Sequence, residues 1–504
     1  MNTEEKKSHN QKRRSLLERI HLRYEIRRAY WKAVFDDVPR PLFSRHFIMF
    51  LISLGLSTGA TFALLQTQPQ EIAFMLGIFI LAALLWVTEA LPLFATALLV
   101  IGLEIILLAN PGEWIGFGFE LGDSPSYREI LSPFADPILI LFLGGFILAR
   151  AAVKEGVDRA LASSILKIFG AQPTMVILGM MLITGVFSMF MSNTATTAMM
   201  ITLVSPLFIN LKEDDPLRKG LVLCIPVAAN IGGMGTPIGS PPNAVAIGFL
   251  RTEGINISFL NWMVIGVPLA IILLLIAWFL ITRVFKSPDP NVKLETRKTD
   301  IKKRGWFVIT IFSITILLWM TDQIHGLPSA VTALFPVIVF TSTGVIDRHD
   351  YNNLEWHILA LIAGGIALGL GMKLSGLDVL IVSLIPTESP FIFGLLIVFT
   401  VLLSIFMSNT AAANLLIPLG ITLATLSFGI GKVEVAYYGL SIALASSAAM
   451  ALPISTPPNA IAYAQGTLVS KDFIKVGGIL SVAAILLIAL FGPEVIGFWA
   501  DHLK

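Results

Sequence analysis

The feature that most constrains this chain is a pair of polar motifs that occurs twice inside long apolar sequence. The first motif, Phe187–Thr197, reads FSMFMSNTATT, and its copy, Leu403–Ala413, reads LSIFMSNTAAA. A second motif follows each copy: Ser240–Ala244 reads SPPNA and Thr456–Ala460 reads TPPNA. Both motifs return at one shift, because position 193 becomes 409 and position 240 becomes 456. Two motifs repeated in order at one shift indicate a duplicated unit.

Composition places this duplicated unit in a membrane. The chain has 504 residues, of which 55% are hydrophobic and 13% are charged, whereas soluble proteins carry about 25% charged residues. Several apolar runs approach the ~20 residues that span a bilayer. The single cysteine, Cys224, excludes an intramolecular disulfide and a cysteine-rich metal site. The predicted fold class is therefore an all-α polytopic membrane protein.

The placement of basic residues predicts the domain organisation. Residues 1–46 are rich in Lys and Arg, which predicts a cytoplasmic basic amphipathic segment on anionic lipid rather than a nucleic-acid-binding arm. A first repeat is expected over 47–285 and a second over 305–504, joined by a basic cytoplasmic linker, 286–304. By the positive-inside rule, the N-terminus lies in the cytoplasm and the chain passes repeatedly through the cell (inner) membrane.

Two apolar segments are predicted to enter the membrane and turn back. Basic residues flank segment 171–209 on both sides, at Lys167 and Lys212. If both ends are cytoplasmic, the segment cannot simply cross. We therefore predict a re-entrant hairpin over about 171–209 with Ser-Asn-Thr at its tip, and a second hairpin over about 390–427.

The remaining apolar segments are predicted to cross. Two of them are broken helices, at about 220–250 and 435–466, and the last span covers about 473–497. The other predicted spans are 47–66, 72–90, 92–109, 136–153, 259–283, 305–321, 327–345 and 356–374. The prediction is thus about 11 transmembrane helices plus two re-entrant hairpins. Three crossings separate the linker from the second hairpin, so the two hairpins enter from opposite faces and form an inverted repeat.

The motif segments contain no ionisable side chain, which limits their chemistry. No Asp, Glu, Lys, Arg or His occurs in 182–211, 221–250, 391–431 or 435–470. Without an acid–base pair or a metal-binding His/Cys spacing, an enzyme is not expected. Hydroxyl groups, amides and carbonyls freed by the paired prolines suit an alkali cation, and helix N-termini receive anions. An anion in such a site needs compensating charge, so we expect co-bound Na⁺. The alternative is that these Ser and Thr residues only bond their own helices.

The paired Ser-Asn-Thr and Pro-Pro-Asn-Ala motifs resemble those of the divalent anion/sodium symporter family, which carries dicarboxylates, citrate or sulfate. The resemblance covers the chain from about Phe47 to the C-terminus. It implies a homodimeric, elevator-type transporter that couples Na⁺ to uptake of a divalent anion, with a C4-dicarboxylate (succinate, malate or fumarate) favoured. The alternatives are a sodium-independent dicarboxylate exchanger, a citrate or sulfate symporter, or, from another class, an ion channel.

The resemblance also implies site residues, matched motif by motif. The first Na⁺ site would use Ser188, Ser192, Asn193 and Gly239. The second would use Ser404, Met407 through its carbonyl, Asn409 and Ser455. The substrate would lie between the tips, on Asn193, Thr194, Asn409 and Thr410, with Ser240 and Thr456 completing its site.

Overall fold

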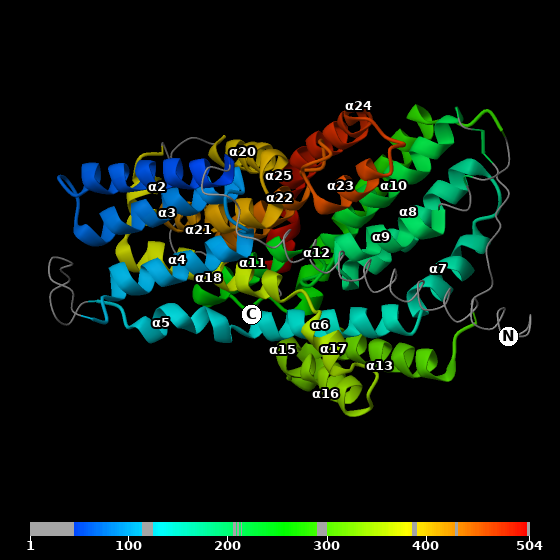
Figure 1. The fold of residues 1–504 in the computed structure, drawn as a ribbon, viewed down its shortest axis with the longest axis horizontal. Coiled ribbons are helices and arrows are strands. Elements are labelled where there is room, and N and C mark those ends of the chain that lie inside the picture. Colours follow the sequence, from blue (N-terminus) through cyan, green and yellow to red (C-terminus); the bar gives the residue numbers. More distant parts are fainter. Residues whose placement is uncertain are drawn as a thin grey trace, which may run out of the picture. The chain divides into compact units, whose positions relative to one another are not determined.

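The computed structural model describes residues 45–112, 124–204, 208, 211–212, 214–289, 300–385, 391–428 and 432–500. Throughout these ranges the regular structure is helical, with no strand (Figure 1). Two compact units divide after Ile52, and the second unit, 53–504, holds both repeated motifs. The predicted basic segment 1–46, apart from its last two residues, and the middle of the linker 286–304 lie outside the described residues.

The helices fall into two consecutive sets that follow the duplicated sequence. The first set is α2 (Arg45–Leu64), α3 (Gln70–Thr88), α4 (Leu93–Glu104), the π-helix η1 (Ile105–Ala109), α5 (Tyr127–Leu131), the 3-10 helix η2 (Ser132–Ala135), α6 (Pro137–Lys154), α7 (Val157–Ile168), α8 (Pro173–Phe190), α9 (Asn193–Val204), α10 (Pro216–Gly233), α11 (Pro241–Thr252) and α12 (Phe259–Val284). The second set is α13 (Lys303–Met320), α14 (Asp322–His325), α15 (Ser329–Thr332), α16 (Leu334–Ser342), α17 (Arg348–Asn352), α18 (Trp356–Ser375), α19 (Leu377–Ser383), α20 (Ile392–Phe406), α21 (Asn409–Phe428), α22 (Lys432–Ser447), α23 (Pro457–Ala464), α24 (Ser470–Phe473), the π-helix η4 (Ile474–Gly478) and α25 (Ile479–Ala500).

Among the described residues, nine helices are long and apolar enough to cross a membrane, which differs from the predicted count of about 11. Two of the nine, Pro173–Phe190 and Asn409–Ser427, are arms of the predicted hairpins. The predicted spans 92–109 and 327–345 form shorter apolar helices, and spans 220–250 and 435–466 are interrupted. Length and composition therefore establish a multi-pass, all-helical protein, whereas the number of crossings stays a prediction.

The helices break at the repeated motifs. Helix α8 ends at Phe190, and Met191 is extended, with φ −130° and ψ 158°. Met407 does the same after α20, with φ −132° and ψ 173°. Each second motif separates two half-helices, α10 from α11 and α22 from α23, and its paired prolines occupy the first turn of the second half-helix. Proline fits that turn because the first N–H groups of a helix have no intrahelical partner. Whether the hairpins are re-entrant stays a prediction.

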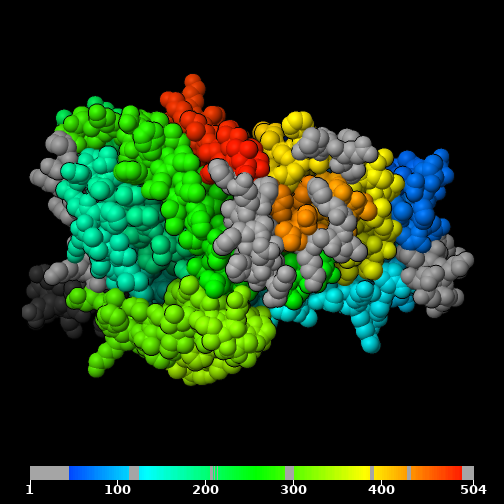
Figure 2. All heavy atoms as spheres, turned by 180° about the vertical axis from the view of Figure 1, so that it is seen from behind, coloured from blue at the N-terminus to red at the C-terminus, as the bar shows by residue number. Residues whose placement is uncertain are grey.

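The two repeats pack on each other through equivalent pairs of helices, one helix of each pair coming from each repeat. Helix α4 packs on α18 of the other repeat, and α15 and α16 pack on α6. A Cβ atom on Gly364 would lie 2.4 Å from the Cβ of Ala97, and one on Gly144 would lie 2.8 Å from that of Ala333. Helices approach this closely only where a glycine omits the side chain. Figure 1 shows α13, α15 and α16 gathered on one side, beside α6, which all three contact. In Figure 2 the same part of the chain is the yellow-green region seen from behind.

The helices that carry the motifs also pack across the two repeats. Helix α10 packs on α8 and α9 of its own repeat and on α23 of the other repeat. Helix α22 correspondingly packs on α20, α21 and α11. Two further pairs also pack across the repeats, α9 with α23 and α21 with α11. As a result, each Ser-Asn-Thr helix contacts the Pro-Pro-Asn-Ala helix of the other repeat.

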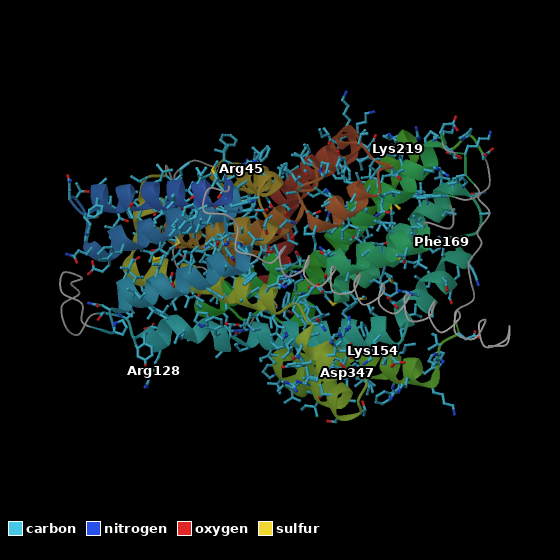
Figure 3. The ribbon with its side chains drawn as sticks, viewed as in Figure 1. Arg45, Arg128, Lys154, Phe169, Lys219 and Asp347 are labelled. Carbon is cyan, nitrogen blue, oxygen red and sulfur yellow. The ribbon has the colours of Figure 1, made fainter. Side chains whose placement is uncertain are left out.

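A cluster of charges joins α6 to the short helix α17 and its N-cap residue. The Lys154 ammonium lies 2.9 Å from an oxygen of Asp347 and also contacts Asp350, and Arg150 lies 2.8 Å from Asp350 (Figure 3). The backbone N–H of Asp350, followed by the Lys154 ammonium, lowers the pKa of Asp347 to about 2. Asp350 is buried and Asp347 is exposed, so removing Asp350 should cost more stability.

Candidate functional site

The first cluster forms where the tip after α8 meets the broken end of α10. The buried Ser188 hydroxyl lies 2.8 Å from the carbonyl oxygen of Ala229 and 2.5 Å from Oδ1 of Asn193. A hydroxyl has one proton and can donate it to only one of these oxygens. At least one oxygen of the cluster therefore has no hydrogen directed at it from Ser188.

Glycines let the backbone complete this cluster. A Cβ atom on Gly233 would lie 2.6 Å from Oδ1 of Asn193 and 2.8 Å from the carbonyl oxygen of Gly239. Without an ion, the reversed amide satisfies this cluster, because Asn193 then donates to the carbonyls of Gly239, at 3.1 Å, and Ala229, at 3.2 Å, and to Oγ of Ser188, at 2.5 Å. With its oxygen inward, four oxygens converge around a single hydroxyl proton. Convergent carbonyl and side-chain oxygens of this kind can replace the hydration shell of an alkali cation.

Ser192 is the one predicted first-site residue whose side chain is directed elsewhere. Its hydroxyl accepts a hydrogen bond of 3.3 Å from the backbone N–H of Ala195 and so caps α9. This is a usual role for serine at a helix start, because it satisfies one of the unpaired N–H groups. The structure thus brings Ser188, Asn193 and Gly239 together and leaves the Ser192 side chain at the rim.

The second cluster has the same frame. The buried Ser404 hydroxyl lies 2.9 Å from Oδ1 of Asn409 and 2.7 Å from the carbonyl oxygen of Ser446. Ser455 is buried, donates to the carbonyl of Ile405 at 3.0 Å and accepts from the N–H of Leu452 at 3.2 Å. Ser404 and Asn409 are therefore joined directly, whereas Ser455 ties the broken helix to the end of α20.

The asparagines of the Pro-Pro-Asn-Ala motifs hold the broken backbone. Asn243 donates to the carbonyls of Gly233, at 2.9 Å, and Thr236, at 2.8 Å. Asn459 donates to those of Met450, at 3.1 Å, and Leu452, at 2.9 Å. Both asparagines are fully buried. Each amide therefore replaces the intrahelical partners that the break removes.

The predicted substrate residues lie at helix starts. Thr194 and Thr410 lie in the first turns of α9 and α21, and Ser240 and Thr456 occupy the N-cap positions of α11 and α23. Of these two, only Thr456 accepts a capping hydrogen bond through its side chain. Thr456 Oγ1 accepts from the N–H of Asn459 at 3.2 Å and from Nδ2 of Asn230 at 3.0 Å. Because both acceptor positions are used, its hydroxyl proton is free to be donated to an anion. Helix N-termini add further N–H donors and a favourable dipole.

Three kinds of contributor to the site were missed from the sequence: two polar side chains, two backbone carbonyls and one carboxylate. Asn230 and Ser447 precede the two breaks and reach across to the other repeat, and the carbonyls of Ala229 and Ser446 complete the clusters. An amide inside the apolar stretch of α10 was the available signal for Asn230. Backbone carbonyls give no signal in the sequence, because every residue has one.

The third is a carboxylate next to the first tip. Glu355, the residue before α18, lies beside the Ser192 hydroxyl. Its Oε2 is buried and has no hydrogen-bond partner among the described residues. A negative charge here favours cation binding at the first tip. The same described part of the chain has no group of three His, Cys, Asp or Glu residues that could hold a metal ion.

Comparison with known proteins identifies the family. A model of the citrate transporter family (CitMHS) matches residues 83–437. An uncharacterized transporter of Haemophilus influenzae is 33% identical over 457 residues, which cover 86% of this chain and 94% of that protein. The sodium-dependent dicarboxylate transporter SdcS of Staphylococcus saprophyticus is 32% identical over 86% of this chain and 89% of its own.

A solved structure supports the fold alone. The YdaH transporter of Alcanivorax borkumensis, described as having an unusual topology, superposes with a TM-score of 0.53 at 13% identity. The alignment covers 83% of this chain and 98% of that one. The family match and the relatives confirm the resemblance that the motifs predicted. This chain belongs to the citrate transporter family, is related to the sodium-dependent dicarboxylate transporter SdcS, and is a multi-pass membrane transporter rather than an enzyme.

Proposed function

We propose that this transporter couples inward movement of Na⁺ to uptake of a divalent anion, with a C4-dicarboxylate as the favoured substrate. One observation carries the proposal: each repeat closes a Ser–Asn–carbonyl oxygen cluster at a broken helix, as Ser188–Asn193–Ala229 and as Ser404–Asn409–Ser446. The name of the relative SdcS, a sodium-dependent dicarboxylate transporter, supports the choice of ion and substrate.

Electrostatics explains why cation and anion would bind together. The motif segments carry no Lys, Arg or His that could balance a dianion, and an uncompensated charge in a low-dielectric site costs several kcal/mol. One Na⁺ in each cluster would supply that compensation. Ser188, Asn193 and Gly239 would hold the first ion, and Ser404, Asn409, Ser455 and the Met407 carbonyl the second. Thr194, Thr410, Ser240 and Thr456 would donate to the substrate carboxylates.

The proposed mechanism is an elevator movement in a homodimer with its N-terminus in the cytoplasm. The moving part would contain both hairpins and both broken helices. These pack on one another through the pairs α9–α23 and α11–α21, each of which joins the two repeats. The scaffold would contain the helices joined at the Gly364–Ala97 and Gly144–Ala333 contacts. This division keeps the ion and anion ligands within one body.

Uptake into proteoliposomes tests the proposal. Labelled succinate should accumulate when Na⁺ is higher outside, with a sigmoidal dependence on Na⁺, and unlabelled malate and fumarate should compete. Accumulation that needs no Na⁺ but requires internal dicarboxylate would identify an exchanger instead. Stronger competition by citrate or sulfate than by malate would reassign the substrate.

A further inference from the structure

Each broken helix serves both repeats with two consecutive residues. In α10, the carbonyl of Ala229 accepts from Ser188 at 2.8 Å, and the next side chain, Asn230, reaches the other repeat. In α22, the carbonyl of Ser446 accepts from Ser404 at 2.7 Å, and the next side chain, Ser447, also reaches across. The backbone thus belongs to one cluster while the adjacent side chain supports the other.

The two side chains that reach the other repeat, Asn230 and Ser447, contact equivalent residues there. Asn230 Nδ2 donates to Oγ1 of Thr456 at 3.0 Å and to Oδ1 of Asn459 at 3.2 Å. Ser447 Oγ lies 3.2 Å from Oγ of Ser240, the residue that Thr456 matches. All of these side chains are buried, with at most 3% of their surface exposed. The contacts are therefore shielded from water. Hydrogen bonds are stronger in such a low-dielectric interior.

The hydrogen bonds that Asn230 and Ser447 make to the other repeat differ in strength. Asn230 satisfies both the hydroxyl and the amide oxygen of its target motif. Ser447 is too short to do the same, and Oδ1 of Asn243 stays buried with no hydrogen-bond partner among the described residues. The amide oxygens of Asn243 and Asn459 thus differ because the crossing residue is Ser in one case and Asn in the other.

We infer that Asn230 and Ser447 are positioning residues that couple the two Na⁺ clusters, with Asn230 forming the stronger link. This inference rests on the proposed function. An ion held by the Ala229 carbonyl fixes the end of α10 and with it the Asn230 amide. Asn230 in turn fixes Thr456 and Asn459, and Asn459 holds the carbonyls of the second break. Such coupling is reciprocal, so each ion raises the affinity for the other.

Exchanging the two residues tests this coupling. Asn230→Ser should reduce the Hill slope of Na⁺-dependent uptake from about 2 toward 1 and raise the half-saturating Na⁺ concentration about five-fold. Ser447→Asn places an amide toward Asn243 and should lower that concentration. Ser447→Ala removes a single hydroxyl from a helix, so it should fold, and it should have a weaker effect than Asn230→Ser. Cys224→Ser, a nearly isosteric change on the same helix, is the matched control.

A second measurement separates coupling from a structural role. The melting temperature of the purified protein without substrate is recorded across Na⁺ concentrations. Coupling predicts a shallower Na⁺ dependence in Asn230→Ser and Ser447→Ala, whereas a structural role lowers the melting temperature equally at every concentration. Unchanged Na⁺ cooperativity in both variants would overturn the inference, as would a change confined to the succinate KM at saturating Na⁺. Wild-type uptake that ignores Na⁺ would remove the proposed function itself.

Discussion

The two oxygen clusters share one frame but are supported differently. In the first, Gly233 and Gly239 bring backbone against backbone: a Cβ atom on Gly239 would lie 2.6 Å from the carbonyl oxygen of Gly233. In the second, Ser455 occupies the position that matches Gly239, and its hydroxyl bonds to the carbonyl of Ile405. The first cluster therefore has no room for an added side chain, whereas the second already accommodates one.

This difference shows what the duplication conserved and what it left free. The serine, the asparagine and the carbonyl before the break occur in both clusters, because they form the set of oxygens itself. The supporting residues diverged, since a break can be held by close backbone packing or by a hydroxyl bridge. We expect two sites of unequal Na⁺ affinity, and the variants below test that expectation from the largest effect to the smallest.

The shared frame predicts the largest effects. Asn193→Ala and Asn409→Ala should each reduce Na⁺-driven succinate uptake at least about 100-fold, because each leaves buried oxygens without their partner. Proteoliposome uptake measures this, and size-exclusion chromatography confirms assembly. If either variant keeps near-normal uptake, its cluster is not an ion site.

The divergent support predicts an asymmetric response to reciprocal exchange. Gly239→Ser should abolish uptake, because the new Cβ meets a backbone oxygen that cannot move aside. Ser455→Gly should only raise the half-saturating Na⁺ concentration several-fold, through loss of the two hydrogen bonds of its hydroxyl. Parallel Na⁺ titrations compare the two variants. Equal effects would mean that the clusters are supported alike.

The carboxylate beside the first tip predicts a smaller effect. Glu355→Gln should raise the half-saturating Na⁺ concentration two- to five-fold at low ionic strength, as expected for a charge interaction of about 1 kcal/mol at partial burial. Added choline chloride should shrink the difference only in part, since it screens a partly buried charge less than an exposed one and does not replace Na⁺. A constant ratio at all ionic strengths would argue against an electrostatic role.

Asp347→Asn should have the smallest effect and serves as the charge control, because Asp347 pairs with Lys154 of α6. Because its pKa is lowered to about 2, Asp347 stabilises the fold above the ordinary carboxyl pKa and loses that effect only as the pH falls toward 2. The melting-temperature difference between wild type and Asp347→Asn should therefore stay constant from about pH 8 to pH 5. A difference that disappears at pH 6 would contradict this.

Local sequence determined the chemistry of each half. The apolar runs required helices, the paired prolines required breaks, and the spacing of Ser188 from Asn193, and of Ser404 from Asn409, placed each pair across one tip. These features depend on neighbouring residues along the chain. For the same reason, the family could be recognised before any coordinates were known.

Tertiary structure alone decided how the halves meet. The Asn230–Thr456 bond, the Gly364–Ala97 contact and the approach of Glu355 to Ser192 all join residues far apart in sequence. Periodicity describes which face of a helix is apolar but not which distant helix covers it, and it assigns no role to a backbone carbonyl. The types of ligand could therefore be predicted from the sequence. Their partners in the other repeat were determined only by the tertiary packing.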